Sequence, residues 1–75
     1  MKQQFKFDYS LLLGLIKTKG YTQETLAQKI GISGWSVWNK LSGKGYFTQP
    51  EIAAISQALG ISQDLISVYF FTPSL

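Results

Sequence analysis

The sequence has no cysteine, no histidine and no arginine among its 75 residues. Without cysteine, no disulfide can stabilise so short a chain, and without cysteine or histidine we expect no zinc or other soft-metal site. The lack of arginine removes the commonest base-specific contact with DNA, the bidentate pair with guanine. We expect no metal and no cofactor.

Long apolar runs are also missing, so no membrane span is expected. The first six residues carry charge without the long apolar run of a secretory signal, which favours a cytoplasmic location. By contrast, 45% of the residues are hydrophobic and 15% aromatic, enough to favour a folded chain over disorder. The length fits one domain over residues 1–75.

Catalytic groups are scarce, and we expect no enzyme. The four carboxylates are Asp8, Glu24, Glu51 and Asp64, and each is placed where a helix would begin. No pair of them has a spacing that favours acid–base work. The net charge of +3 is compatible with a phosphate backbone as partner, but many unrelated domains are equally basic.

Five apolar-periodic stretches separated by turn signals predict an all-α fold. We expect helices over residues 9–19, 23–30, 34–42, 49–59 and 63–70. Asp8, Thr22, Ser33 and Thr48 are their expected N-caps, the last within a Thr48–Glu51 capping box. In the last helix, Leu65, Val68 and Tyr69 are expected to face inward. Residues 5–7 are expected to be extended and to lie against that helix.

The segment from Thr22 to Lys44 predicts two short helices joined by a sharp turn. Ala27 is small where the helices must approach, and Gly31 can adopt the positive φ that the turn requires. Ser33 caps the second helix. Val37 and Leu41 lie one turn apart and are expected to anchor that helix to the core, which leaves its opposite face exposed.

This segment resembles the helix-turn-helix of the Cro/phage-repressor class, the XRE-type family with a lambda-repressor-like fold. The similarity lies in Gln23, Leu26-Ala27, Gly31-Ile32-Ser33, Val37 and Leu41-Ser42-Gly43-Lys44. The wider frame is similar to small Cro-like regulators of temperate phages and prophages of Gram-positive bacteria. The resemblance implies five helices and a repressor of transcription in the lysis/lysogeny switch. It also implies a homodimer on double-stranded operator DNA at the bacterial nucleoid.

The resemblance further implies which residues meet DNA, with the second helix of the motif in the major groove. The base-facing candidates are Ser33, Gly34, Trp35, Ser36 and Asn39. The candidates for phosphate contacts are Gln23, Lys29, Lys40, Ser42 and Lys44. Asn39 can pair with adenine, and the lysines would add salt-dependent attraction.

Surplus apolar residues indicate a second hypothesis. Gly34 and Trp35 occupy positions that are polar in many members of the family, and Leu11, Leu13 and Leu15 widen the apolar arc of the first helix. These leucines, with Trp35 and Trp38, would form the interface of an antirepressor that makes a heterodimer with a cognate phage repressor. The alternative for the leucines is simple burial against the last helix and the N-terminal segment. An antitoxin is a weaker third hypothesis, because only residues 72–75 could form the disordered tail.

Overall fold

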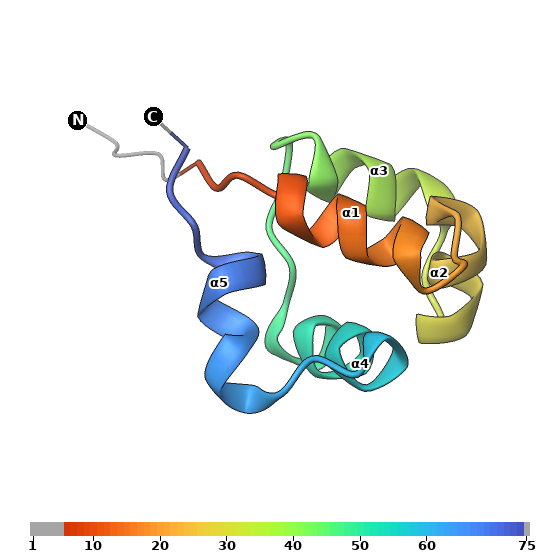
Figure 1. Cartoon of the computed structure of the whole chain (residues 1–75). Coiled ribbons are helices and arrows are strands. Elements are labelled where there is room, and N and C mark those ends of the chain that lie inside the picture. The colour runs from red at the N-terminus through yellow and green to blue at the C-terminus, as the bar shows by residue number, and fades with distance from the viewer. Residues whose placement is uncertain (1–5, 75) are drawn as a thin grey trace.

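The computed structural model describes residues 6–74 and contains the five α-helices that the sequence predicts, so the all-α fold is confirmed (Figure 1). The helices are α1 (Ser10–Thr18), α2 (Gln23–Ile30), α3 (Gly34–Leu41), α4 (Gln49–Leu59) and α5 (Ile66–Phe70), with a 3₁₀ turn η1 (Gln63–Leu65) directly before α5. None of the helices in the described part combines the length and hydropathy needed to cross a lipid bilayer.

The helix starts follow the capping residues closely. Thr48 accepts a hydrogen bond from the backbone N–H of Glu51, and the Glu51 carboxylate accepts one from the N–H of Thr48, which confirms the capping box. At α1 the expected cap is displaced by one residue. Tyr9 is the N-cap, while Asp8 Oδ1 accepts a hydrogen bond from Ser10 N at 2.9 Å.

The core lies between α1, α2, α4 and α5. Its most deeply buried side chains are Leu12, Leu26, Ile55, Leu59 and Phe70, each at most 1% exposed. Two aromatic edge-to-face contacts extend it, because the ring of Phe47 lies 5.6 Å from Tyr9 and 5.7 Å from Phe70. Phe47 follows α3 in the chain, so the core reaches under the α3–α4 connection.

The last helix differs from the prediction. Leu65 and Val68 are 44% and 41% exposed, so the expectation that they face inward is wrong, whereas Tyr69 packs against the core as expected. The reason is the 3₁₀ turn η1, whose tighter winding shifts the phase of the residues that follow. Phe70 consequently takes the buried position.

The two chain ends pair with each other. Phe7 and Pro73 form an isolated antiparallel bridge, with hydrogen bonds from Asp8 N to Thr72 O and from Ser74 N to Lys6 O. The ring of Phe7 also lies edge-on to that of Phe71, at 5.7 Å. Residues 6 and 7 of the expected extended segment therefore do lie beside the end of α5, and residue 5 is outside the described part.

Candidate functional site

The turn between α2 and α3 has the geometry that its sequence predicts. Gly31 adopts φ 82° and ψ 26°, and its N–H bonds to the carbonyl of Ala27. Ile32 N donates to the same carbonyl at 3.0 Å. Ser33 then caps α3 by accepting a hydrogen bond from Ser36 N at 3.1 Å. Because φ near +80° suits glycine above other residues, Gly31 sets the angle at which α3 leaves α2.

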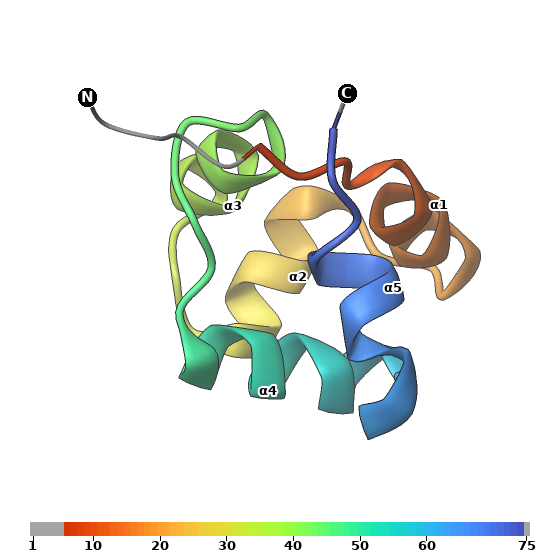
Figure 2. The ribbon, with the colours of Figure 1, turned by 90° about the vertical axis from the view of Figure 1, so that its left-hand side faces the viewer.

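The inner surfaces of α2 and α3 are closely packed. Leu26, Ala27 and Val37 are each at most 1% exposed. A Cβ at Gly34 would lie 3.7 Å from the backbone of Glu24, so the start of α3 approaches α2 closely. Figure 2 shows α2 between α3 and α1, with α4 below it. The outer side of α3 is thereby left exposed.

The outer side of α3 carries two tryptophans. Trp35 is 73% exposed and Trp38 is 48% exposed, and they are one turn apart on the helix. Lys44 follows the helix and holds its Nζ 5.4 Å from the centroid of the Trp38 ring, a cation–π contact. We call Trp35 and Trp38 the tryptophan face.

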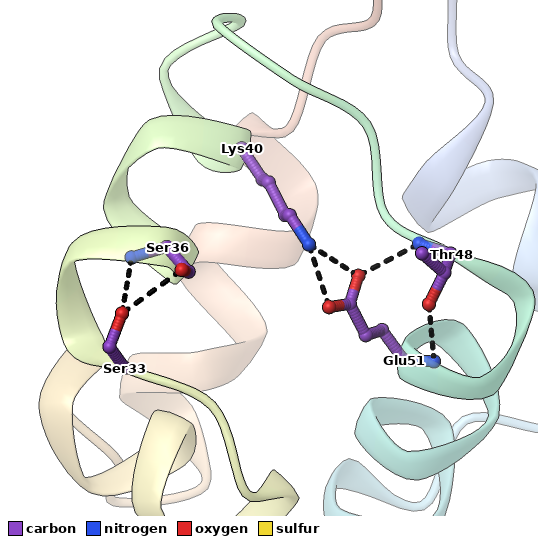
Figure 3. Close-up of polar contacts among 5 residues, drawn as sticks. All are labelled: Ser33, Ser36, Lys40, Thr48 and Glu51. Carbon is purple, nitrogen blue, oxygen red and sulfur yellow. Dashed lines mark hydrogen bonds and ion pairs between the residues drawn. The ribbon is translucent and has the colours of Figure 1, made fainter.

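The other expected base-facing residues surround the tryptophan face. Ser33 is exposed, whereas Gly34, Ser36 and Asn39 are half-buried. The hydroxyl of Ser33 also donates a hydrogen bond to Ser36 Oγ at 3.0 Å (Figure 3). The first turn of α3 thus brings four of the five candidates together, but its two hydroxyls are already bonded to each other.

Lys40 does not face outward. Its Nζ lies 2.6 Å from both carboxylate oxygens of Glu51, and the two side chains are 20% and 16% exposed (Figure 3). The same Nζ is 6.0 Å from the centroid of the Phe47 ring. A position three residues after the buried Val37 lies on the inner flank of the helix, toward α4. A phosphate contact would require this ion pair to break, so we leave Lys40 out of the candidate site.

Glu51 is ionised in this setting. Burial is the largest single effect and raises the pKa of its carboxyl, but the hydrogen bonds from Lys40 and Thr48 and the charge of Lys40 together outweigh it. The pKa therefore falls below its ordinary value of 4.5. The pair links α3 to the start of α4.

The remaining candidates for phosphate contacts lie on α2 and directly after α3. Gln23 is half-buried at the first position of α2, and Lys29 is exposed in the last turn of that helix. Ser42 is exposed and donates a hydrogen bond to the carbonyl of Asn39 at 3.0 Å. Lys44 is exposed beside Trp38. Four of the five candidates are therefore accessible.

The three leucines of the expected interface separate in space. Leu11 is 55% exposed, whereas Leu15 packs against the core. Leu13 is half-buried and lines a surface hollow together with Trp38 and Leu41. Burial accounts for Leu15, as the alternative reading of the sequence expects. The exposed aromatic ring of Tyr46, which lies 6.2 Å from Phe7, has no counterpart among the sequence-based candidates. The residues next to Tyr46 in the sequence do not indicate that its ring contacts Phe7, which is distant along the chain.

Metal ligands do not gather in the described part of the chain, where no three acidic side chains come close enough to hold an ion. The side chains of the candidate site can make three kinds of contact: apolar burial at the tryptophan face, hydrogen bonds at Asn39, and charge interactions at Lys29 and Lys44.

Comparison with known proteins supplies the family. No match is found among curated proteins. The solution structure of the modulator of repression of the temperate bacteriophage TP901-1 from Lactococcus lactis is similar to this chain at a TM-score of 0.75. The two share 36% sequence identity over 88% of this chain and 89% of the other. Residues 5–73 match the family described as "Protein of unknown function (DUF739)", and the chain belongs to this family.

Proposed function

We propose that this protein is a modulator of repression, which binds a phage repressor through the tryptophan face and thereby covers the surface with which that repressor reads DNA. The observation that carries the proposal is the exposure of Trp35 and Trp38 on one side of α3. The similarity to a phage modulator of repression supports it.

Exposed tryptophans are costly in water and valuable in an interface. Apolar surface gains roughly 25 cal/mol per Å² when it leaves water. Tryptophan is among the residues most enriched at interface hot spots, where truncation to alanine costs about 2 kcal/mol or more. Because both rings stand on α3, a single partner surface can cover them together.

The polar chemistry of α3 is poorly suited to base reading. The position that would follow the cap is Gly34, which has no side chain to offer a base. The Ser33 hydroxyl is bonded to Ser36, and Lys40 is paired with Glu51. Since the chain also has no arginine, few strong contacts to bases remain.

DNA binding is the second candidate, and the shape of the α2–α3 unit favours it. Asn39, Lys29 and Lys44 would supply one base contact and two phosphate contacts on a major groove. The net charge of +3 is of the sign that phosphate attracts. A homodimer on paired half-sites would belong to this second candidate.

The direct test is titration calorimetry of the chain with a purified phage repressor encoded next to it. We expect tight binding, weakened about 30-fold or more by Trp35→Ala, as a hot-spot loss of 2 kcal/mol implies. Leu65→Ala is the control, since Leu65 is 44% exposed and belongs to η1. The segment that forms η1, the blue turn directly before α5, lies away from α3 in both views of the ribbon (Figures 1 and 2). Specific, salt-sensitive binding to operator DNA by the chain alone, with no binding to the repressor, would overturn the proposal in favour of the second candidate.

A further inference from the structure

Three hollows on the side of the molecule formed by α1 and the end of α3 all have Leu13 in their walls. Their volumes are about 290, 180 and 210 Å³. The first two share Leu41 and Ser42, and the second and third share Gln23. Because they share wall residues, the three hollows adjoin one another, and we call them together the Leu13 groove.

The middle of the Leu13 groove has a mixed wall. Leu13, Leu41 and Trp38 form its apolar part, with both leucines half-buried, and Gln23 and Ser42 form its polar part. The core does not need Leu13, since Leu12 and Ile16 of the same helix are already 0% and 2% exposed. The apolar part of the wall can bury an apolar side chain of an occupant, and Gln23 and Ser42 can hydrogen-bond to the backbone or polar groups on either side of it.

The rim of the Leu13 groove is basic. Lys6 lines the hollow at one end and Lys17 lines the hollow at the other, while Lys44 stands over Trp38 beside the middle. Among the described residues that line the three hollows, the only carboxylate is that of Asp8, which lines the first. Its Oδ1 already accepts a hydrogen bond from Ser10 N. An occupant with carboxylates on either side of an apolar residue would complement both the rim and the middle.

We propose that the Leu13 groove holds a segment of the partner repressor in which acidic residues flank an apolar anchor. This inference rests on the proposed function and adds a second contact to it. Trp38 belongs to both the tryptophan face and the wall of the Leu13 groove. A partner that covers Trp38 therefore reaches the groove without a gap, and the groove selects for acidic sequence where the tryptophan face selects for apolar contact.

Charge reversal at matched lysines tests the rim. Lys17 and Lys19 are both exposed at the end of α1, but only Lys17 lines the groove. We expect Lys17→Glu to weaken binding of the purified repressor roughly 3- to 10-fold at low salt, with the difference shrinking as salt is added. Lys19→Glu should change it less than twofold. Equal effects of the two variants would overturn the groove proposal, even where Trp35→Ala still weakens binding and the proposed function stands.

A crosslink identifies the occupant. Because the chain has no cysteine, Ser42→Cys introduces a single thiol in the wall of the Leu13 groove, and Ser67→Cys places one at an exposed control position on α5. With a benzophenone attached to each thiol, we expect the position 42 label to capture a repressor peptide containing Asp or Glu next to an apolar residue. Capture only of peptides that contain no Asp or Glu, or equal capture from both positions, would overturn the groove proposal. No binding of the unmodified chain to the repressor would remove the proposed function and the groove proposal together. If Lys17→Glu weakened binding to DNA but left binding to the repressor unchanged, the lysines of the rim would be assigned to phosphate contacts and the groove proposal would be overturned.

Discussion

Lys40 Nζ and the Glu51 carboxylate form a bidentate ion pair between α3 and α4, with both N–O distances at 2.6 Å. The same carboxylate completes the capping box with the N–H of Thr48 at 2.8 Å. One acidic side chain thus begins α4 and holds α3 in place. The pair therefore joins the helix that carries the tryptophan face to the start of α4.

Removing one partner of the pair should destabilise the protein. We expect Lys40→Met to lower the free energy of unfolding by about 1–2 kcal/mol, because Glu51 would keep its charge in a partly buried site without a counter-ion. Lys29→Met is the control, since Lys29 is exposed, and should stay within about 0.5 kcal/mol. Urea denaturation of both variants measures the difference. A loss of the same size in both variants would show that the pair adds nothing.

The pair should also make stability depend on pH in the acid range. Since the pKa of Glu51 is lowered in the folded protein, its stabilisation is fully present above the unfolded value near 4.5 and is lost as pH falls through the folded value. Glu51→Gln keeps an oxygen for Thr48 but has no charge to lose. We expect thermal melts of the two proteins to differ most above about pH 5 and to converge in more acidic buffer. A gap that widens with acidity would contradict the assignment.

Two glycines should respond to alanine in opposite directions. Gly31→Ala should destabilise by about 1 kcal/mol, because φ is 82° while no atom crowds the added Cβ, so the cost is that of the backbone alone. Gly14 lies within α1 with open space around it. Gly14→Ala should stabilise by about 0.5–1 kcal/mol through helix propensity. Thermal unfolding reports both, and the same sign for the two variants would contradict the account of the turn.

Ser56 is buried in α4, and its hydroxyl has no hydrogen-bond partner among residues 6–74. Ser56→Ala should therefore raise the free energy of unfolding by about 1 kcal/mol, since it removes an unsatisfied polar group and improves helix propensity. Ser67→Ala on the exposed side of α5 should change it by less than half as much. Guanidinium titrations compare them. Destabilisation by Ser56→Ala would mean that the hydroxyl does bond in the folded protein.

The local features of this fold could be predicted from sequence, because each is set by residues a few positions apart. The caps at Thr22, Ser33 and Thr48 and the left-handed turn at Gly31 are of this kind. Which residues of α5 face inward could not be predicted, because the sequence around Leu65 suits a 3₁₀ turn as well as the first turn of an α-helix.

The candidate site was harder to predict, because its surfaces depend on contacts between distant segments. The sequence predicts that Lys40 faces outward, because it does not show that Glu51 of α4 lies beside it in the fold. In the sequence Leu13 is one apolar residue more than the core needs, and only the fold shows that it lines a hollow together with Leu41 and Trp38. Trp35 could be identified as exposed from helical periodicity alone, because it lies two residues before the buried Val37 and therefore on the opposite side of the helix.

The central claim is tested most directly by fluorescence anisotropy of a labelled operator duplex that is saturated with the phage repressor. Adding this protein should return the anisotropy to the value of free DNA, and adding its Trp35→Ala variant at the same concentration should leave it high. An anisotropy that stays high or rises further with the unmodified protein, because the protein joins the duplex instead of removing the repressor, would contradict the account.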